Sequence, residues 1–407
     1  MKAYFHTFGC RVNQYETQQL RERLDAEPAE SFEDADLCVV NTCTVTATAD
    51  RDALRLVRKI ARRNPAARLV VTGCLATRDP KAILKEAPAA LVIGNKDKDS
   101  IPALLGCSAA PMGVTGLSSR SRAFVKIQDG CNMACRFCVI PAIRPELSSK
   151  PFAELKREIA GLIARGIPEV VLCGVRLGRY LSTENGKRID FVSALERLLA
   201  LPGNFRVRLS SLEITDVGDR LIAVMAESNG KLCPSIHSPL QSGSTAVLKK
   251  MGRWYSAEFY ARRIAALKER VPHVGLFADV MTGFPGETED EHQESVAFIE
   301  KTGFSGLHVF RYSKRPGTPA ARAPEQVSEG GILRRAQELR ALDEKLRAAF
   351  AARAAGLERT VVPELSGLEA LTEDFLTVRL PKALPPGLHR ARVEGRLLDG
   401  VPTALVY

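Results

Sequence analysis

The chain has 407 residues, of which 45% are hydrophobic and 26% charged, so it is long enough for two to four domains with buried cores. Its 30 Gly and 23 Pro residues are too few for a collagen-like or low-complexity chain. No apolar run approaches the roughly 18 to 20 residues that a membrane helix needs, and the N-terminus lacks the apolar core of a signal peptide. We therefore expect a cytoplasmic protein without a membrane partner, and the net charge of +11 favours a polyanionic partner.

Short apolar runs alternate with helical patterns near the N-terminus and predict a small parallel α/β domain over residues 1–110. The runs cover residues 3–8, 37–40, 69–71 and 91–93. The first three are each followed by a cysteine: Cys10, Cys43 and Cys74. Ligands gather at the carboxyl ends of parallel strands, so we expect these thiols to converge. The alternative is three unrelated buried thiols.

Three further cysteines, Cys131, Cys135 and Cys138, form one tight group. Three thiolates in one short loop can ligate three irons of a cubane cluster and leave the fourth iron open. A structural zinc site would want a fourth protein ligand nearby, and no His follows within dozens of residues. We interpret the other cysteines as packing residues: Cys38, Cys107, Cys173 and Cys233. The histidines show no metal-binding spacing, and none is assigned a role: His6, His237, His273, His292, His308 and His389.

A Gly/Ser-rich stretch at residues 111–122 is typical of a linker. Six strand-like runs then alternate with helical patterns, at residues 124–128, 169–173, 205–210, 232–237, 274–281 and 306–312. Six units are too few for a closed eightfold barrel, so residues 123–325 are predicted to form a partial parallel β/α barrel. Residues 326–356 predict a helical connector. Short strands at 360–364, 375–380, 390–393 and 403–407 predict a small β-barrel over residues 357–407.

With these elements in place, the sequence resembles the radical S-adenosylmethionine (SAM) methylthiotransferases over almost its full length. The Cys131 group matches the signature of the radical SAM superfamily, and the three dispersed N-terminal cysteines match the auxiliary cluster of that family. Further matches follow in family order at residues 140–141, 210–213, 239–244, 283–288 and 312–319. The small β-barrel predicted over residues 357–407 resembles the RNA-binding TRAM domain in position and length, although these residues include six Lys/Arg and seven Asp/Glu.

The segment from Gly9 to Thr17 looks like the branch of the family that acts on threonylcarbamoyladenosine in tRNA, as do residues 174–178 and 308–310. The chain departs from the family at 142–145, where Ala-Ile-Arg-Pro replaces Tyr-Ala-Arg-Gly, at Lys150 in place of Arg, and at Arg176, where that branch often has His. These departures bear on substrate identity more than on cluster chemistry, because they alter the rim of the site rather than the ligands.

The resemblance implies two 4Fe-4S clusters. Cys131, Cys135 and Cys138 would be the catalytic ligands of a cluster that chelates SAM, and Cys10, Cys43 and Cys74 the ligands of the auxiliary cluster. SAM cleavage would give a deoxyadenosyl radical that takes hydrogen from carbon 2 of an adenine, and the auxiliary cluster would deliver a methylthio group. A reduced flavodoxin or ferredoxin would supply electrons.

Several residues are expected to bind SAM by the same resemblance: Ser211, Glu213, Gln241, Gly283 and Gly286. Ser211 and Glu213 are two apart on a predicted strand, so they would share one face. The alternative is an exposed strand face without a ligand.

A basic stripe on the predicted helix 50–63 is the clearest candidate for RNA contact. It consists of Arg51, Arg55, Arg58 and Arg62, at three- and four-residue spacing. The alternative is a solvated charged face.

Together these features lead us to expect a tRNA methylthiotransferase that modifies carbon 2 of N6-threonylcarbamoyladenosine beside the anticodon. Two alternatives stay open. The same chemistry could act on isopentenyladenosine or on a ribosomal-protein aspartate, or the chain could be a non-catalytic, RNA-binding iron-sulfur protein.

Overall fold

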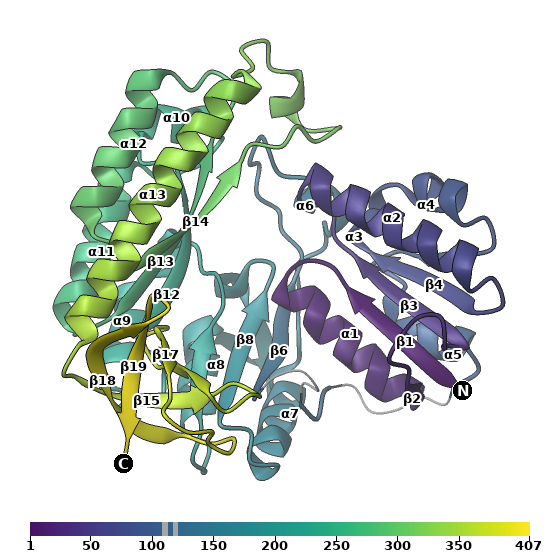
Figure 1. Ribbon diagram of the computed structural model, residues 1–407, viewed down its shortest axis with the longest axis horizontal. Coiled ribbons are helices and arrows are strands. Elements are labelled where there is room, and N and C mark those ends of the chain that lie inside the picture. Colours follow the sequence, from purple (N-terminus) through teal and green to yellow (C-terminus); the bar gives the residue numbers. More distant parts are fainter. Residues whose placement is uncertain (108–112, 117–120) are drawn as a thin grey trace.

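The computed structural model describes residues 1–107, 113–116 and 121–407. Its parts are an N-terminal α/β domain, an open β/α barrel and a small C-terminal β-barrel (Figure 1). Half of the predicted linker lies outside the described residues, and its last residue, Arg122, already belongs to the first barrel strand. Within the described ranges, no helix is long and apolar enough to cross a membrane.

The N-terminal domain contains the predicted parallel sheet, with five strands in the order β2-β1-β3-β4-β5. Its central strand β3 (Leu37–Thr42) is buried along its whole length, because helices cover both faces. Val39 packs toward α1 and Val40 toward α2. The other elements are β1 (Lys2–Thr7), α1 (Arg11–Leu24), β2 (Glu27–Pro28), α2 (Ala47–Arg63), β4 (Arg68–Gly73), α3 (Cys74–Arg78), α4 (Pro80–Glu86), β5 (Leu91–Ile93), η1 (Lys98–Ser100) and α5 (Ile101–Leu104).

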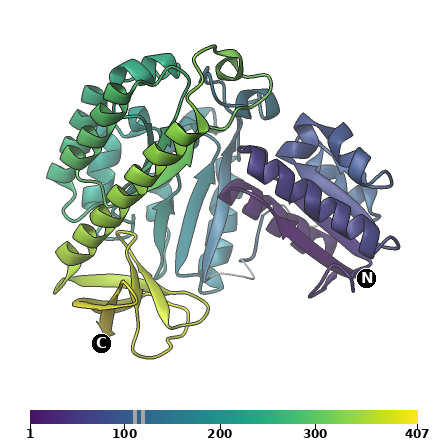
Figure 2. The same cartoon turned by 45° about the horizontal axis from the view of Figure 1, so that its top comes forward.

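The barrel contains six parallel strands in chain order: β6 (Arg122–Asp129), β8 (Glu169–Gly174), β11 (Arg206–Leu209), β12 (Ser235–Gln241), β13 (Gly275–Thr282) and β14 (Gly306–Arg311). Single bridges at Val207–Leu232 and Ser211–His237 join its two sheets. The fourth strand begins later than the predicted 232–237. Figure 2 shows the N-terminal domain beside β6, at the open side of the barrel.

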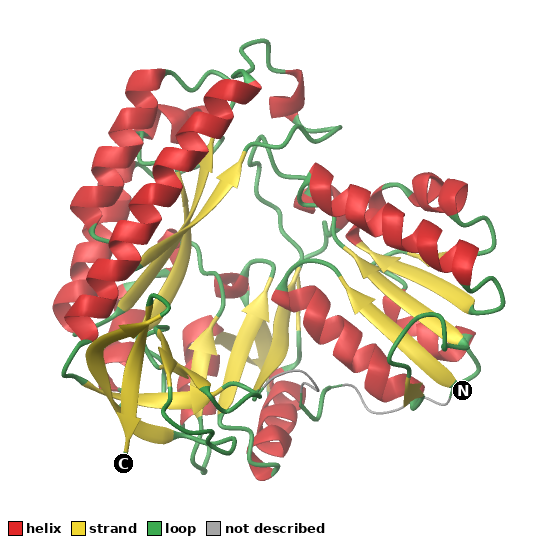
Figure 3. Cartoon of the chain, viewed as in Figure 1, coloured by secondary structure: helices red, strands yellow, loops and turns green. Residues whose placement is uncertain are grey.

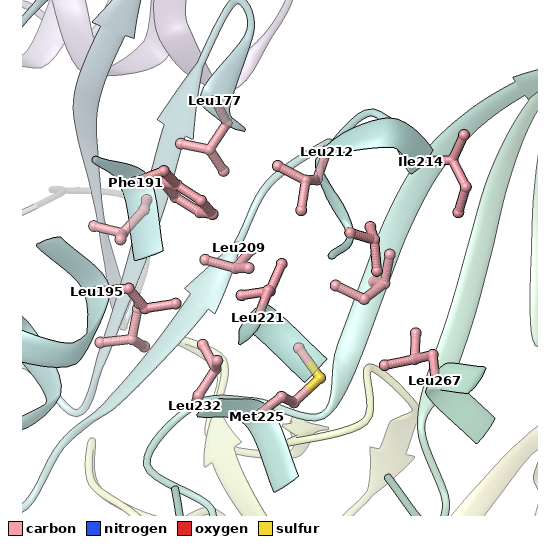
Figure 4. Close-up of a cluster of buried hydrophobic side chains, with 14 of the residues drawn as sticks. Leu177, Phe191, Leu195, Leu209, Leu212, Ile214, Leu221, Met225, Leu232 and Leu267 are labelled. Carbon is pink, nitrogen blue, oxygen red and sulfur yellow. The ribbon is translucent and has the colours of Figure 1, made fainter. Parts of the chain in front are cut away.

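Helices cover the outside of the barrel (Figure 3) and enclose the largest apolar core, part of which is drawn in Figure 4. Leu209 and Leu232 come from the strand side of this core, and Leu195 and Leu221 from helices. The remaining elements are α6 (Ile140–Ile143), β7 (Ser148–Ser149), α7 (Phe152–Ala164), η2 (Leu177–Arg179), β9 (Leu181–Glu184), β10 (Lys187–Asp190), α8 (Phe191–Leu199), η3 (Ile214–Asp216), α9 (Asp219–Glu227), α10 (Thr245–Lys250), α11 (Ala257–Arg270), α12 (Glu289–Thr302), η4 (Pro319–Arg322) and α13 (Glu329–Ala354).

The C-terminal residues form a closed barrel, β15-β16-β17-β19-β18, as predicted. Its strands are β15 (Glu358–Pro363), β16 (Glu369–Thr372), β17 (Thr377–Arg379), β18 (His389–Leu398) and β19 (Val401–Val406). The prediction missed β16 and wrongly placed Phe375 in a strand. Phe375 lies in a turn with φ of 72°, and its ring packs 5.2 Å from the ring of Phe277 at the base of the β/α barrel. This tertiary contact outweighs the strand preference of an aromatic residue.

A buried ion cluster fastens the C-terminal barrel to the base of the β/α barrel. Glu169 accepts hydrogen bonds from Arg206 (2.6 Å) and Arg208 (2.8 Å). The same guanidinium groups donate to carbonyl oxygens of the C-terminal barrel, including those of Thr360 (2.7 Å) and Thr372 (2.9 Å). Burial alone would raise the pKa of Glu169, but the arginines hold it well below its ordinary value. The carboxylate is therefore ionised. It holds the two arginines in place, and they in turn connect the β/α barrel to the C-terminal barrel.

We expect Glu169→Gln to lower the free energy of unfolding by about 3–5 kcal/mol, because it removes the carboxylate charge that pairs with the buried guanidinium groups of Arg206 and Arg208. Since the folded-state pKa lies below the unfolded value, the wild-type contribution is present at neutral pH and lost as the pH falls. Urea denaturation at pH 7 measures the change. Glu196→Gln is the control, because Glu196 pairs with Arg220 on the surface. Equal small losses in both variants would contradict the structural role of Glu169.

Candidate functional site

The loop after β6 brings its three cysteines around one cavity of about 190 Å³. The chain turns sharply at Gly130, where φ is +80° and a Cβ atom would lie 1.9 Å from the carbonyl oxygen of Glu146. The amide of Cys131 then donates to the carbonyl of Arg144 (3.0 Å). Burial and, to a smaller extent, the neighbouring cysteines raise the pKa of the Cys138 thiol to about 12. Thiols crowded in this way become favourable ligands once a cationic metal centre compensates their charge.

The N-terminal cysteines also lie together, directly after β1, β3 and β4. Gly9 allows the loop of Cys10 to approach Cys43, since a Cβ atom at Gly9 would lie 2.8 Å from the Cβ of Cys43. Burial and, to a smaller extent, Cys74 and Cys10 raise the pKa of Cys43 to about 12. All ten cysteines are free thiols. The donor set therefore fits a second iron-sulfur group.

The two cysteine groups border one another. Cys74 packs in one apolar cluster with Val139, the residue after Cys138. A cavity of about 180 Å³ is lined by Cys138 on the barrel side and by Val45 and Thr46, just after Cys43, on the other. A molecule in this cavity would contact both loops.

A buried ion network holds the two loops in this arrangement. Glu16 of α1 accepts hydrogen bonds from Arg144 (2.9 Å) and Lys126 (2.8 Å) and pairs with Lys98. Arg144 also binds Asp129 (2.6 Å), the last residue of β6. Burial opposes ionisation, but Lys126, Lys98 and Arg144 hold the pKa of Glu16 well below its ordinary value. The network thus joins the N-terminal domain to both ends of the Cys131 loop.

The residues expected to bind SAM divide into two sets. Ser211, Glu213 and Gln241 line the cavity of the Cys131 group, whereas Gly283 and Gly286 do not. Gly283 instead packs beneath Ile332 of α13, and Gly286 donates to the carbonyl of Glu325 (2.7 Å). The expectation for these two glycines is therefore not supported by the cavity.

Ser211 and Glu213 share the cavity for a reason other than the predicted one. Strand β11 ends at Leu209, so they do not lie on one strand. Ser211 forms a single bridge, and Glu213 directly precedes a 3₁₀ helix. Glu213 is placed by an ion pair with Arg253, which also donates to the Sγ of Cys135 (3.3 Å).

Sequence reasoning missed Arg253 and Asp279, although both line the cavity. Asp279 could have been found from the sequence, because it is the single charged residue of strand β13, which is otherwise apolar except for its last residue, Thr282. No pattern marked Arg253. Two of the histidines that were assigned no role, His237 and His308, both approach Asp279.

The predicted arginine stripe lies on the exposed face of α2. Arg51 donates to Thr48 (3.1 Å), and Arg55 pairs loosely with Asp52 (3.5 Å). Arg58 forms a two-pronged contact with Glu86 (2.5 and 2.7 Å), so its charge is largely compensated. Arg62 has an exposed side chain and, within the described part of the chain, no ion pair.

An open barrel of six parallel strands with a three-cysteine loop after its first strand defines a radical SAM protein. The model of the Radical SAM superfamily matches residues 125–299, and that of "Uncharacterized protein family UPF0004" matches residues 2–94. Membership of this superfamily implies SAM and a 4Fe-4S cluster.

Relatives that match most of this chain identify the family within this superfamily. Threonylcarbamoyladenosine tRNA methylthiotransferase MtaB of Bacillus subtilis is 37% identical over 91% of this chain and 86% of its own. The protein of the same name from Thermotoga maritima is 34% identical, covering 88% and 85%. A tRNA-2-methylthio-N(6)-dimethylallyladenosine synthase from Corynebacterium urealyticum is 33% identical, covering 84% and 68%. The chain belongs to the radical SAM methylthiotransferase family.

A solved structure shares the fold at low identity. The radical SAM methyltransferase TsrM from Kitasatospora setae superposes with a TM-score of 0.57 at 15% identity, covering 79% of this chain and 75% of that chain.

Removing Arg144 should loosen the junction between the two cysteine loops. Arg144→Met leaves the buried Glu16 and Asp129 with fewer cationic partners, so we expect a loss of about 3–5 kcal/mol in the free energy of unfolding. Arg136→Met is the matched control from the same region, because the Arg136 side chain is exposed, and we expect a change within about 0.5 kcal/mol. Guanidinium denaturation of the reconstituted protein compares the two, and equal stabilities would refute the role of the network.

Proposed function

We propose that this protein is a tRNA methylthiotransferase that adds a methylthio group to carbon 2 of N6-threonylcarbamoyladenosine next to the anticodon. The observation that carries this proposal is the shared cavity, lined by Cys138 on one side and by the residues after Cys43 on the other. Transfer of a sulfur group from one centre to a base activated at the other needs this juxtaposition. The names of the full-length relatives support the same activity.

Two 4Fe-4S clusters and SAM are the proposed cofactors. Cys131, Cys135 and Cys138 would hold the cluster that binds SAM, and Cys10, Cys43 and Cys74 the auxiliary cluster. When bound, these groups supply radical chemistry and a transferable sulfur atom. The support is the donor set, two separate groups of three free thiols.

The surrounding residues would orient SAM and the base. Arg253 holds the Glu213 carboxylate beside the Cys131 group and also contacts Cys135, so ligand and carboxylate keep a fixed relative position. Burial raises the pKa of Glu213, while Arg253 opposes this shift. Such a carboxylate can accept hydrogen bonds from the SAM amino group. Gln241 lines both cavities and is placed to contact SAM and the base.

The partners we propose are tRNA and a reduced electron donor such as flavodoxin or ferredoxin. The exposed arginines of α2 lie on the helix that follows Cys43, so they would contact phosphates close to the reacting base. The cytoplasm, where tRNA is modified, is the proposed location.

The decisive experiment is mass spectrometry of tRNA nucleosides after anaerobic incubation with SAM, a reductant and the reconstituted protein. We expect methylthiolated threonylcarbamoyladenosine from tRNA that carries the threonylcarbamoyl group and little product from isopentenyl-modified tRNA. Equal turnover of both would contradict the substrate assignment. Absence of product from either, with intact clusters, would contradict the activity.

The auxiliary cysteines should be required for sulfur transfer but not for SAM cleavage. The wild-type protein should bind about eight irons and a variant with Cys10, Cys43 and Cys74 replaced by Ala about four, since each cubane holds four. The variant should still release deoxyadenosine from SAM but give no methylthiolated nucleoside. Replacing Cys135 alone should stop both reactions. Methylthiolated product from the triple variant would show that the division of roles is wrong.

The salt dependence of tRNA binding tests the arginine stripe. For each phosphate contact that is lost, the slope of log affinity against log salt should flatten by roughly 0.7 to 0.9. We therefore expect Arg51→Gln combined with Arg62→Gln to weaken binding and reduce the slope by about one to two units. Arg58→Gln should have a smaller effect, because Glu86 already compensates its charge. An unchanged slope in the double variant would leave α2 as a solvated charged face.

A further inference from the structure

Two histidines and one aspartate converge on the inner face of three adjacent strands. Asp279 of β13 lies opposite His308 of β14 in the sheet register. A single oxygen of Asp279 lies 2.7 Å from Nε2 of His237 and 3.4 Å from Nδ1 of His308. The two imidazole rings are nearly perpendicular, with centroids 4.6 Å apart. We call these three residues the His-Asp-His cluster.

The cluster forms the floor of the catalytic cavity. Beneath it, Phe277 and Phe375 close the base of the barrel, and the space left there is about 10 Å³, no more than one water molecule. Above it, Asp279 lines both the cavity of the Cys131 group and the cavity shared by the two cysteine groups. Any ligand that fills these cavities would therefore meet Asp279, and Nδ1 of His308 lies 3.4 Å from that carboxylate.

One nitrogen atom of the cluster, Nε2 of His308, is available for a further hydrogen bond. Burial would raise the pKa of Asp279, but hydrogen bonds from His237 and His308 lower it below its ordinary value, so the carboxylate is charged. The His308 side chain is 44% exposed, compared with 19% for Asp279. Its Nδ1 faces Asp279, and among the described residues Nε2 has no hydrogen-bond partner. Nε2 is therefore available to a ligand.

The shape of a purine nucleoside decides which part of it reaches this floor, an argument that rests on the proposed function. The glycosidic bond leaves the five-membered ring and must lead back to the RNA, so the six-membered ring enters the pocket first. The substituent on N6 then extends deepest. In threonylcarbamoyladenosine that substituent contains ureido N–H groups and ends in a carboxylate.

We propose that the His-Asp-His cluster recognises this anionic N6 substituent. His308 lies between two carboxylates, donating from Nδ1 to Asp279 and from Nε2 to the carboxylate of the substrate. A ring placed in this way presents one nitrogen to each carboxylate, and hydrogen bonds to ionised acceptors are among the strong ones. His237 fixes the position of Asp279 and thereby orients the His308 ring. An apolar substituent would bury these groups without partners, which disfavours it.

The test is a cycle of variants and substrates, read by binding rather than by turnover. The reconstituted protein is titrated with fluorescent anticodon stem-loops that carry threonylcarbamoyladenosine or its neutral carboxamide analogue. We expect the wild-type protein to bind the acid about tenfold or more tightly than the amide, the range for a hydrogen bond to a charged group. His308→Gln should bind both with equal affinity, because it lacks the ring nitrogen that faces the substrate carboxylate. Asp279→Asn should reduce the preference in the same direction.

The control variant is His273→Asn, at an exposed surface position where φ is 59° and Asn is well tolerated. It should keep the wild-type preference. An undiminished preference for the acid in both His308→Gln and Asp279→Asn would overturn the proposal. A metal analysis could also overturn it. If the wild-type protein held one metal ion per chain in addition to the cluster irons, and Asp279→Asn lost that ion, the two histidines and the carboxylate would be a metal site. Failure of the proposed function gives a different result: no methylthiolated product from the wild-type protein.

Discussion

The buried network around Glu16 is the constraint on which the catalytic arrangement depends. The two cysteine groups come from different domains, and apolar packing between domains leaves their relative orientation poorly defined. A buried carboxylate is more demanding, because it is stable only where its cationic partners reach it. Glu16 forms ion pairs with Lys98 of its own domain and with Lys126 and Arg144 of the barrel. The domains therefore have one well-paired orientation, and it places Cys74 against the Cys131 loop.

A second buried pair closes the opposite side of the shared cavity. Arg315, after β14, donates to Asp50 of α2 (2.5 Å) and to Thr44 (2.8 Å). The amide of Ala47 also donates to the Ser313 hydroxyl (3.1 Å). The N-terminal domain is thus tied to the first strand of the barrel through Glu16 and to the loop after its last strand through Asp50. It spans the opening of the incomplete barrel, and its cysteine loops complete the wall of the cavity.

The sequence predicted the position of a residue where that position follows from the strand next to it, and failed where the position depends on contacts with distant segments. Cys10, Cys43 and Cys74 follow apolar strands, and the rule that parallel strands share a carboxyl edge was enough to bring them together. The Glu16–Arg144 pair joins residues 128 positions apart, and no local pattern marks either. The His-Asp-His cluster needs the register of three strands. Phe375 was misplaced for a related reason, because its conformation is set by its contact with another domain.

The residues that can contribute to tRNA affinity and those that can contribute to substrate specificity lie in different parts of the protein. Arginines on the outer face of α2 can contribute phosphate contacts that are alike for every tRNA, since such contacts hold an RNA in place without reading its bases. The floor of the barrel lies at the other end of the path that a flipped base would take, and it is polar and charged where the rest of the core is apolar. A charged group at that depth is costly unless a ligand or neighbour pairs with it. His237 and His308 meet part of that cost in the free protein, and the exposed Nε2 of His308 leaves the remaining interaction to the substrate. Selection among modified adenines would then follow from the chemistry of one substituent, independently of how tightly the tRNA body is held.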